Sequence, residues 1–230
     1  MKKVILGVNV DDIKMGEALE IVHEWLGKKS KHYIVTPNPE IIVAAQDDKR
    51  YRSLLNDADL SIPDGIGLKL SGKVKNHIAG VDFMEKLISY SGDWGVTVGL
   101  LGGKDGVAEK AADCLRKKYP KIKVVFAESG GEVDEDGNVI ARNAVTDGCD
   151  LLFVAFGPPK QEKWIAKNLD KLPVKVAMGV GGAFNYLSGE VRRAPKWVRS
   201  LGLEWLFRLI SQPWRIKRQM ALIKYVLLLK

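Results

Sequence analysis

The feature that most constrains the fold is a regular alternation of strand-like runs with segments of helical periodicity. Short apolar runs such as HYIV (32–35) and DLLFVAF (150–156) end in turns of Gly, Pro and small polar residues, and apolar residues at helical spacing follow. Alternating strands and helices pack as a parallel sheet. The pattern therefore predicts an α/β, Rossmann-like fold with a mostly parallel sheet and helices on both faces.

The alternation divides the first 190 residues into seven strand segments and six helical segments. With their turns, the expected strands cover 2–8, 32–39, 58–65, 95–103, 122–130, 150–162 and 174–184. The expected helices cover 16–26, 39–47, 81–90, 107–119, 138–146 and 161–169. A chain of 230 residues is long enough for one such domain and an appendage.

The segment after residue 189 differs from the rest in charge and pattern. It contains ten basic and two acidic residues, whereas the preceding part contains 26 of each. Four apolar residues repeat at intervals of four: Trp197, Leu201, Trp205 and Leu209. A basic, amphipathic tail on a neutral body favours docking on an anionic membrane surface, with packing on the body or nucleic-acid binding as alternatives. We expect a core over 1–191 and a helical membrane-docking appendage over 192–230.

The N-terminus and the cysteines indicate the compartment. The run MKKVILGVNVDD is too short for a signal peptide and is interpreted as a first strand. Cys114 and Cys149 lack metal-ligand spacing, so we expect both to be buried thiols in a reducing cytoplasm. Together with the basic tail, this predicts a cytoplasmic protein that lies peripherally at the inner face of the cell membrane.

The stretch LSIPDGIG (60–67) holds the main catalytic candidate. Its apolar run stops at Pro63, and Asp64 follows in a turn with two glycines. Open α/β sheets bind ligands at the carboxyl ends of their strands, which makes this carboxylate a candidate for catalysis. A solvated acid in an ordinary surface turn is the alternative.

Other turns at expected strand ends suit phosphates and sugars. In TPNPE (36–40), the Thr36 hydroxyl, the Asn38 amide and the N–H groups of a helix start face one spot, although Asn38 also fits as a plain helix cap. The run GLLGGKDG (99–106), which includes Gly102, lacks the Gly-Lys-Ser/Thr ending of a Walker loop. It remains a candidate loop for close approach to a nucleotide.

Two further turns extend this set. In GPPKQE (157–162), Lys160 suits a phosphate and Gln161 a hydroxyl or a base edge, and GVGGAFN (179–185) includes Gly181 in a glycine turn. Together the turns predict a binding crevice on the carboxyl edge of the sheet. The sequence contains no Ser–His–Asp or Cys–His pattern and no metal-ligand spacing, so we expect no metal site.

The motifs occur together and in order along the chain. They are TPNPE (36–40), PDGIG (63–67), AGVDFM (79–84), LLGGKDGVAEKAA (100–112), FGPPKQEKWI (156–165), GVGGAFNYLSGEVRRAPKWV (179–198) and GLEWLFRL (202–209). In this set the sequence resembles the WecG/TagA/CpsF family of glycosyltransferases (glycosyltransferase family 26) over most of its length.

The resemblance implies an inverting, metal-independent glycosyltransferase without a cofactor. Its donor would be a UDP-sugar, in one branch UDP-N-acetylmannosamine, and its acceptor polyprenyl-diphosphate-linked N-acetylglucosamine. The products of such enzymes feed wall teichoic acid, enterobacterial common antigen or exopolysaccharide. The implied fold is a Rossmann-like core whose C-terminal appendage brings the enzyme to the membrane. A second copy of the chain is a further candidate partner, whereas nucleic acid is not expected.

The resemblance also implies roles for single residues. Asp64 becomes the general base, Thr36, Asn38 and Gln161 line the sugar site, and appendage residues among Arg208, Arg215 and Arg218 hold phosphates. With Lys160, Gly102 and Gly181 from the turns, these form the expected substrate site. The family commonly has an arginine where this chain has His77, in a segment that is shorter than usual. A histidine replaces that arginine only in part, because it is neutral for much of the time near pH 7.

In the expected reaction a carboxylate removes the proton of the attacking sugar hydroxyl as the new bond forms. Helix N-termini, Lys160 and tail arginines would stabilise the departing UDP. We expect the tail to be mobile in solution and to order over the crevice on binding. Two alternatives are a nucleotide-dependent oxidoreductase, which GVNVDD at the end of the first strand fits badly, and a nucleic-acid-binding module, which leaves the glycine turns unexplained.

Overall fold

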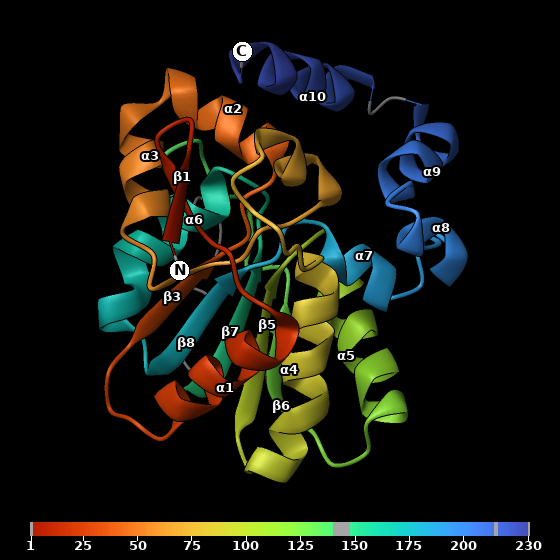
Figure 1. Cartoon of the computed structure of the whole chain (residues 1–230). Helices are drawn as coiled ribbons and strands as arrows, with labels where there is room; N and C mark the ends of the chain where they lie inside the picture. Colours follow the sequence, from red (N-terminus) through yellow and green to blue (C-terminus); the bar gives the residue numbers. More distant parts are fainter. Residues whose placement is uncertain (1, 140–147, 214–215, 230) are drawn as a thin grey trace.

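The computed structural model describes residues 2–139, 148–213 and 216–229, without the side chains of residues 200 and 217–219. Six parallel strands form the central sheet in the order β4-β3-β8-β7-β5-β6 (Figure 1). The strands are β3 (His32–Val35), β4 (Leu60–Ser61), β5 (Thr97–Gly102), β6 (Lys123–Glu128), β7 (Cys149–Ala155) and β8 (Val174–Gly179). The predicted parallel α/β sheet is confirmed.

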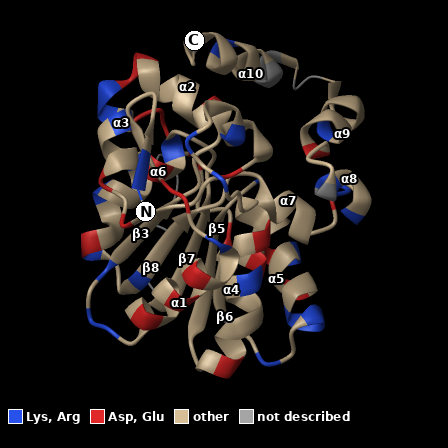
Figure 2. Ribbon diagram, in the orientation of Figure 1, with Lys and Arg blue, Asp and Glu red and all other residues tan. Residues whose placement is uncertain are grey.

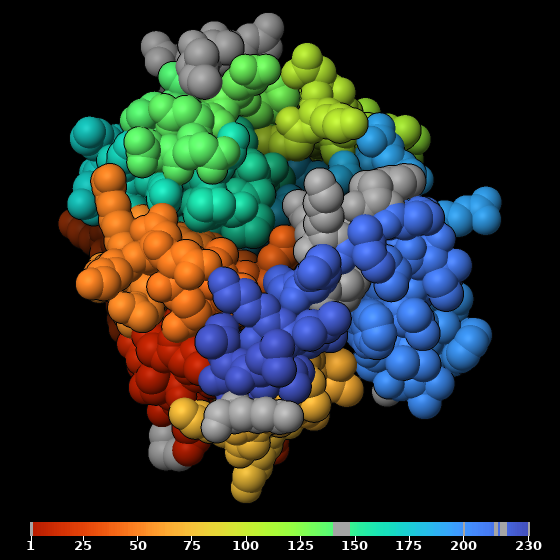
Figure 3. Space-filling view, turned by 90° about the horizontal axis from the view of Figure 1, so that it is seen from above, coloured from red at the N-terminus to blue at the C-terminus, as the bar shows by residue number. Residues whose placement is uncertain are grey.

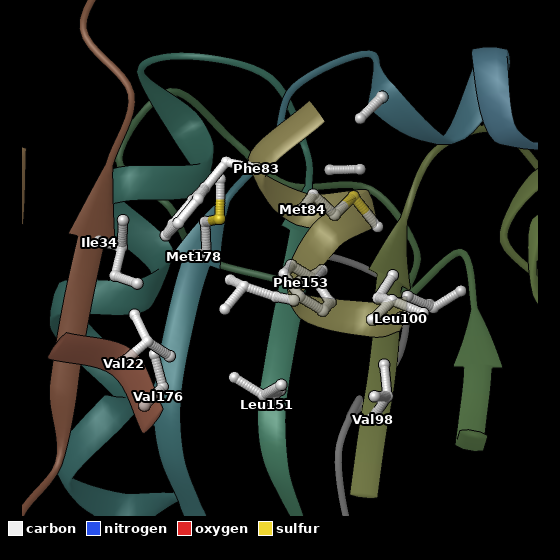
Figure 4. Close-up of a cluster of buried hydrophobic side chains, with 14 of the residues drawn as sticks. Val22, Ile34, Phe83, Met84, Val98, Leu100, Leu151, Phe153, Val176 and Met178 are labelled. Atoms are coloured by element: carbon white, nitrogen blue, oxygen red, sulfur yellow. The ribbon is translucent and has the colours of Figure 1, made fainter. Parts of the chain in front are cut away.

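Helices cover both faces of the sheet, because the central strands carry apolar side chains on both sides. One face is covered by α1 (Met15–Leu26), α4 (Gly80–Trp94) and α5 (Val107–Lys118), and the other by α2 (Pro39–Asp47), α3 (Lys49–Asn56) and α6 (Lys160–Asn168). On the first face, Phe83 and Met84 of α4 lie in one cluster with Phe153 and Met178 of the sheet (Figure 4). This two-sided packing makes the sheet a rigid support for the turns at its ends.

The N-terminal run does not join this sheet, so the prediction of a first core strand there is wrong. β1 (Lys2–Ile5) and β2 (Val8–Asp11) form a separate antiparallel hairpin. The two turn residues, Leu6 and Gly7, have φ angles of 48° and 79°. Such left-handed conformations are what a tight two-residue hairpin turn requires. One turn therefore folds the expected strand back on itself.

The helices of the core overlap their predicted segments. α2 has the predicted bounds, because Asn38 caps it by accepting a hydrogen bond from the backbone N–H of Ile41 at 2.9 Å. The periodicity did not predict four short elements: α3, α7 (Ala183–Leu187), and the 3₁₀ helices η1 (Ile66–Ser71) and η2 (Leu169–Lys171). The helix predicted over 138–146 falls mainly on residues 140–147, which lie outside the described residues.

The two cysteines differ in their surroundings. Cys149 of β7 is buried as predicted, whereas Cys114 of α5 is exposed, which corrects the prediction for that residue. The buried stripe of α5 is formed by Val107, Ala108, Ala111, Ala112 and Leu115. Because position 114 lies beside this stripe and not within it, its side chain points to solvent.

The tail forms three helices, α8 (Lys196–Ser200), α9 (Glu204–Ser211) and α10 (Ile216–Leu228). The repeat from Trp197 to Leu209 favours one continuous helix, but the chain turns at Gly202, whose φ of 72° ends α8 and separates it from α9. In Figure 1, α10 lies above the carboxyl edge of the sheet and beside α2, and α8 and α9 stand at the side of that edge, beyond α7; Figure 3 shows the same tail from above. The tail therefore borders the edge at which the predicted crevice lies.

The helix α10 packs firmly on the body. The side chain of Tyr225 is fully buried and belongs to the same apolar cluster as Leu68 of η1 and Val43 of α2. At the rim of this contact, Lys224 Nζ donates to Asp47 Oδ2 at 2.9 Å. Among the described helices, none is long and apolar enough to cross a membrane.

Candidate active site

A cavity of about 770 Å³ opens at the carboxyl edge of the sheet. The turns after four strands line it, with Gly103 and Lys104 after β5, Gly131 after β6, Gly157 and Lys160 after β7, and Gly181 after β8. Arg208 of α9 and Gln212, which follows α9, complete the wall on the side of the tail. A cavity of this size and polarity suits a small organic ligand such as a nucleotide sugar.

Asp64 lies at the end of β4, where the chain meets the start of α4. Its backbone N–H donates to the carbonyl oxygen of Pro37 at 2.9 Å, which ties two neighbouring turns together. The backbone N–H of Gly80, the first residue of α4, donates to Asp64 Oδ1 at 3.2 Å. The carboxylate is thus held by backbone groups at the positive end of a helix.

The surroundings of Asp64 change its acidity. Burial raises the pKa of its carboxyl group to about 6. The hydrogen bond from Gly80 and the positive charges of Arg208 and Arg193 lower this pKa, and the negative charge of Glu204 raises it. Asp64 is half-buried and its carboxyl group accepts a backbone hydrogen bond, which does not fit the alternative of a fully solvated turn. Its pKa suits a base that works near neutral pH.

Thr36 and Asn38 lie in the turn beside Asp64. The buried hydroxyl of Thr36 donates to the carbonyl oxygen of Gly179 at 3.5 Å, and its side chain packs against Gly80. Asn38 serves as the cap of α2 described above. Both residues are therefore close to the catalytic candidate, whereas their contacts with a sugar remain predictions.

Arg208 connects the cavity with Asp64. Its guanidinium carbon lies 4.9 Å from the centre of the Tyr186 ring, and both side chains line the cavity. Its buried Nε atom makes no hydrogen bond within the described part of the chain. Of the other two tail arginines, Arg215 lies outside the described residues, and Arg218 belongs to α10 with its side chain undescribed.

An ion-pair cluster fixes the start of the tail on the core, and the sequence patterns did not identify it. Arg193 Nη2 donates to Asp82 Oδ2 at 2.9 Å, and Arg193 Nε donates to Glu204 Oε1 at 3.2 Å. Arg199 Nη1 lies 3.4 Å from Asp82 Oδ1. Asp82 is the acid of the AGVDFM motif, which the sequence has in common with the family. That motif was the one sequence signal that could have indicated a role for Asp82. The cluster joins α4, α8 and α9 next to Asp64.

Lys160 and Gln161 lie at the start of α6 and differ in accessibility. Lys160 lines the cavity, where its Nζ donates to Val133 O at 3.0 Å and pairs with Glu135 at 3.2 Å. The side chain of Gln161 is only 1% exposed. Its amide hydrogen-bonds neighbouring turns of the protein and does not open onto the cavity.

The remaining predicted residues are not equally close to the cavity. Gly181 lines it, whereas Gly102 is buried and does not; the neighbouring Gly103 lines the wall instead. His77 is exposed, and partial burial of its ring and the positive charge of Lys69 lower its pKa. Its imidazole is therefore mainly neutral near pH 7, which does not favour the anion contact of an arginine.

The described residues contain no group of three or more His, Cys, Asp or Glu side chains that could hold a metal ion. The positive charge at the site comes from basic side chains and helix starts. Lys104, Lys160 and Arg208 all line the cavity. Such groups can stabilise a departing diphosphate.

Comparison with known proteins agrees with this geometry. The sequence model described as "Glycosyl transferase WecG/TagA/CpsF family" matches residues 3–230. The chain is also similar to the N-acetylglucosaminyldiphosphoundecaprenol N-acetyl-beta-D-mannosaminyltransferase of Bacillus subtilis (strain 168). The two are 36% identical over 208 residues, which are 88% of this chain and 80% of the relative.

Proposed function

The chain belongs to the WecG/TagA/CpsF family of glycosyltransferases, and on that premise we propose that it transfers N-acetylmannosamine to a lipid-linked acceptor. The donor is UDP-N-acetylmannosamine, and the acceptor is N-acetylglucosamine on a polyprenyl diphosphate. The product belongs to the synthesis of wall teichoic acid. The observation that carries this proposal is the desolvated carboxyl group of Asp64 next to a nucleotide-sized cavity, with Arg208 acting on both.

Asp64 is the proposed general base. The acceptor hydroxyl oxygen attacks the anomeric carbon of the donor, and Asp64 takes the hydroxyl proton as the new C–O bond forms. The bond between the anomeric carbon and the diphosphate breaks, and UDP leaves with the electron pair on the opposite face. A positioned base contributes roughly 10²–10⁴ in rate to such a step. Attack from the face opposite the leaving group inverts the anomeric centre.

The charge that develops on UDP is met by fixed positive groups in this proposal. Lys104, Lys160 and Arg208 line the cavity, and α6 begins at its wall with Lys160. The Tyr186 ring holds the Arg208 guanidinium over the cavity wall. With this set of charges the transfer is proposed to be metal-independent.

The tail is the proposed membrane-docking element. Four apolar side chains on α10, Ile216, Met220, Ile223 and Leu227, are 56–63% exposed and follow one another at helical spacing. They form an outer stripe on the side of α10 away from Tyr225, which is buried in the body. Figure 2 shows no acidic residue on α10. An apolar stripe with basic neighbours fits the surface of an anionic membrane, where the lipid-linked acceptor is held.

An enzymatic assay tests the proposal. The full chain is incubated with a short-chain lipid-diphosphate-linked N-acetylglucosamine acceptor and, in separate reactions, with UDP-N-acetylmannosamine, UDP-N-acetylglucosamine and UDP-glucose. Transfer from UDP-N-acetylmannosamine with release of UDP is the expected result. Binding of NAD or of an oligonucleotide in place of UDP would instead support the oxidoreductase or the nucleic-acid alternative.

A further inference from the structure

The side chain of Gln161 joins two walls of the cavity. Its Oε1 accepts hydrogen bonds from the backbone N–H of Gly157 at 3.2 Å and of Gly181 at 2.8 Å. Gly157 follows β7, Gly181 follows β8, and both residues line the cavity. An amide oxygen has two lone pairs, so these two bonds use its full capacity. The distance between the two turns therefore depends on the orientation of one buried amide.

Glu162 fixes that orientation. Gln161 Nε2 donates to Glu162 Oε1 at 2.7 Å, so the NH₂ end of the amide is held away from the two glycine N–H groups. Rotating the amide by half a turn would set its NH₂ donors against the N–H donors of Gly157 and Gly181. Such a state leaves several buried donors without acceptors, which is costly. The carboxylate of Glu162 therefore fixes the Gln161 amide in the orientation in which its oxygen joins the turns at Gly157 and Gly181.

A second helix, α3, contacts the carboxylate of Glu162. Glu162 is 1% exposed, and its Oε2 accepts a hydrogen bond from the hydroxyl of Tyr51 of α3 at 3.3 Å. Burial raises the pKa of Glu162 to about 7. Hydrogen bonds from Gln161, from its own backbone N–H and from Tyr51 lower this pKa. The hydroxyl of Tyr33, on β3, is a further titratable group close to this carboxylate.

We propose that Glu162 is a positioning residue for donor binding, which acts through Gln161 on the turns at Gly157 and Gly181. The inference rests on the proposed function, because the ligand of the cavity is taken to be the UDP part of the donor. In this assignment neither Glu162 nor Gln161 touches the substrate. Both determine the spacing of the backbone that does.

Gly179 offers a second way to disturb the same pair. A Cβ atom at this position would lie 2.8 Å from Gln161 Nε2 and 3.2 Å from Glu162 Oε1. Gly179→Ala therefore displaces the pair without removing a polar group. A weaker affinity for UDP in this variant supports the role of the pair by a route independent of charge.

The test compares UDP binding by calorimetry and donor kinetics in Glu162→Met, Glu162→Gln, Gly179→Ala and the unchanged chain. We expect Glu162→Met to raise the Kd for UDP and the donor KM about tenfold, with kcat within about threefold. Glu162→Gln should stay within about threefold of the unchanged chain in Kd. Its new carbonyl oxygen can accept from Gln161, and its NH₂ group can donate to the Tyr51 hydroxyl.

Asp150→Asn is the matched control. Asp150 is a half-buried carboxylate at the opposite end of β7, where it accepts from the backbone N–H of Thr97 at 2.8 Å and pairs with Lys175 at 3.0 Å. Its removal should lower the melting temperature but leave UDP binding unchanged. A comparable loss of UDP affinity in this control would show that general destabilisation explains the Glu162 variants, and the inference would be wrong.

Amide hydrogen exchange separates this inference from the proposed function. In Glu162→Met, the amides of Gly157 and Gly181 should exchange about tenfold faster than in the unchanged chain. Unchanged exchange together with unchanged UDP binding in Glu162→Met and Gly179→Ala would overturn the inference. If the unchanged chain binds no UDP, the proposed donor is wrong, and the exchange rates still decide whether Glu162 positions the two turns.

Discussion

At the scale of single residues, the acidity of Asp64 is set by groups from distant parts of the chain. Its backbone contacts come from Pro37 in a neighbouring turn and from Gly80 at the start of α4, whereas Glu204, Arg208 and Arg193 come from the tail. A sequence motif shows that an acid stands after a strand. It does not show how far that acid is desolvated or which charges surround it. Burial is the largest of these effects and makes a proton acceptor from an ordinary aspartate.

Asp64→Asn should abolish turnover and keep the donor site intact. The amide cannot take the proton of the acceptor hydroxyl, so kcat should fall by about 10²–10⁴. The Kd for UDP should change by less than about threefold, because Asp64 is not among the residues that line the cavity. Steady-state kinetics and calorimetry measure both. Near-normal turnover in this variant would exclude Asp64 as the base.

The pH dependence of kcat/KM should report the raised pKa of Asp64. The base must be ionised, so kcat/KM should fall as the pH decreases through about 6. Below that pH it should decline about tenfold per pH unit. An ordinary aspartate would keep its activity to about pH 4. In Glu204→Gln the inflection should move to lower pH, because a negative charge that raises the pKa is removed. An inflection that does not move would argue against this electrostatic coupling.

Gln161 shows where residue patterns and structure diverge. Its position in GPPKQE and the family resemblance both indicate a substrate contact, and the side chain lies at the expected strand end. The tertiary structure, however, gives its amide oxygen to two backbone N–H groups and its NH₂ group to Glu162. Spacing along the chain cannot reveal this, because Gly181 is contributed by a different strand. Which hydrogen-bond partners a polar side chain has is decided by three-dimensional packing.

At the scale of elements, α10 has two apolar sides with different surroundings. Tyr225 is fully buried against the body, whereas Met220, Ile223 and Leu227 are each 63% exposed. A helix that only packed on the core would need one apolar side. The second side is the physical basis for expecting a membrane contact.

Replacing two outer residues of α10 should weaken binding to vesicles. Met220→Glu with Ile223→Glu should lower the affinity for vesicles of anionic phospholipid about tenfold or more, because burial of each side chain is worth about 1.5–3 kcal/mol. Co-sedimentation measures this. Transfer to a water-soluble, short-chain acceptor should persist.

Val125→Glu provides the control for α10. Val125 is 42% exposed on the edge strand β6, away from the tail. This single exchange of an exposed apolar residue for an acid should not affect vesicle binding. If the α10 double variant binds vesicles as the unchanged chain does, the outer stripe is not the membrane contact.

At the scale of the whole molecule, the tail serves as part of the core and as part of the cavity wall. Arg193 joins it to Asp82, Tyr225 enters the core cluster, and Arg208 lines the cavity. These contacts describe a tail that is packed on the body. The division into a core over 1–191 and an appendage over 192–230 remains a prediction, which deletion of the tail can test.

Deletion of residues 193–230 should abolish transfer and lower the melting temperature. The six-stranded sheet lies entirely within the retained part, so the core should still fold. Loss of Tyr225 uncovers apolar side chains such as Leu68 and Val43, and loss of Arg208 opens the cavity. Circular dichroism melts and the transfer assay measure both effects. Full activity in the shortened protein would disprove an essential role of the tail.

The sequence alone was sufficient for the α/β class, the parallel sheet and the turns that meet at its carboxyl edge. Apolar periodicity and turn residues are local properties, and six strand ends of a parallel sheet must share one edge. Local patterns did not predict the left-handed turn at Leu6 and Gly7, which folds the N-terminal run into a hairpin. They also did not predict the turn at Gly202, which separates α8 from α9.

Only the tertiary structure decided which polar groups meet at the site. It brought Asp82 to Arg193, Gln161 to Gly181 and the charge of Arg208 to Asp64, although these partners are far apart in the sequence. Hydrogen bonds, ion pairs and desolvation act over a few ångströms of space, and the chain path determines which residues share that space. The sequence therefore identifies the residues of the candidate active site, whereas the fold decides the acidity, orientation and accessibility of their side chains.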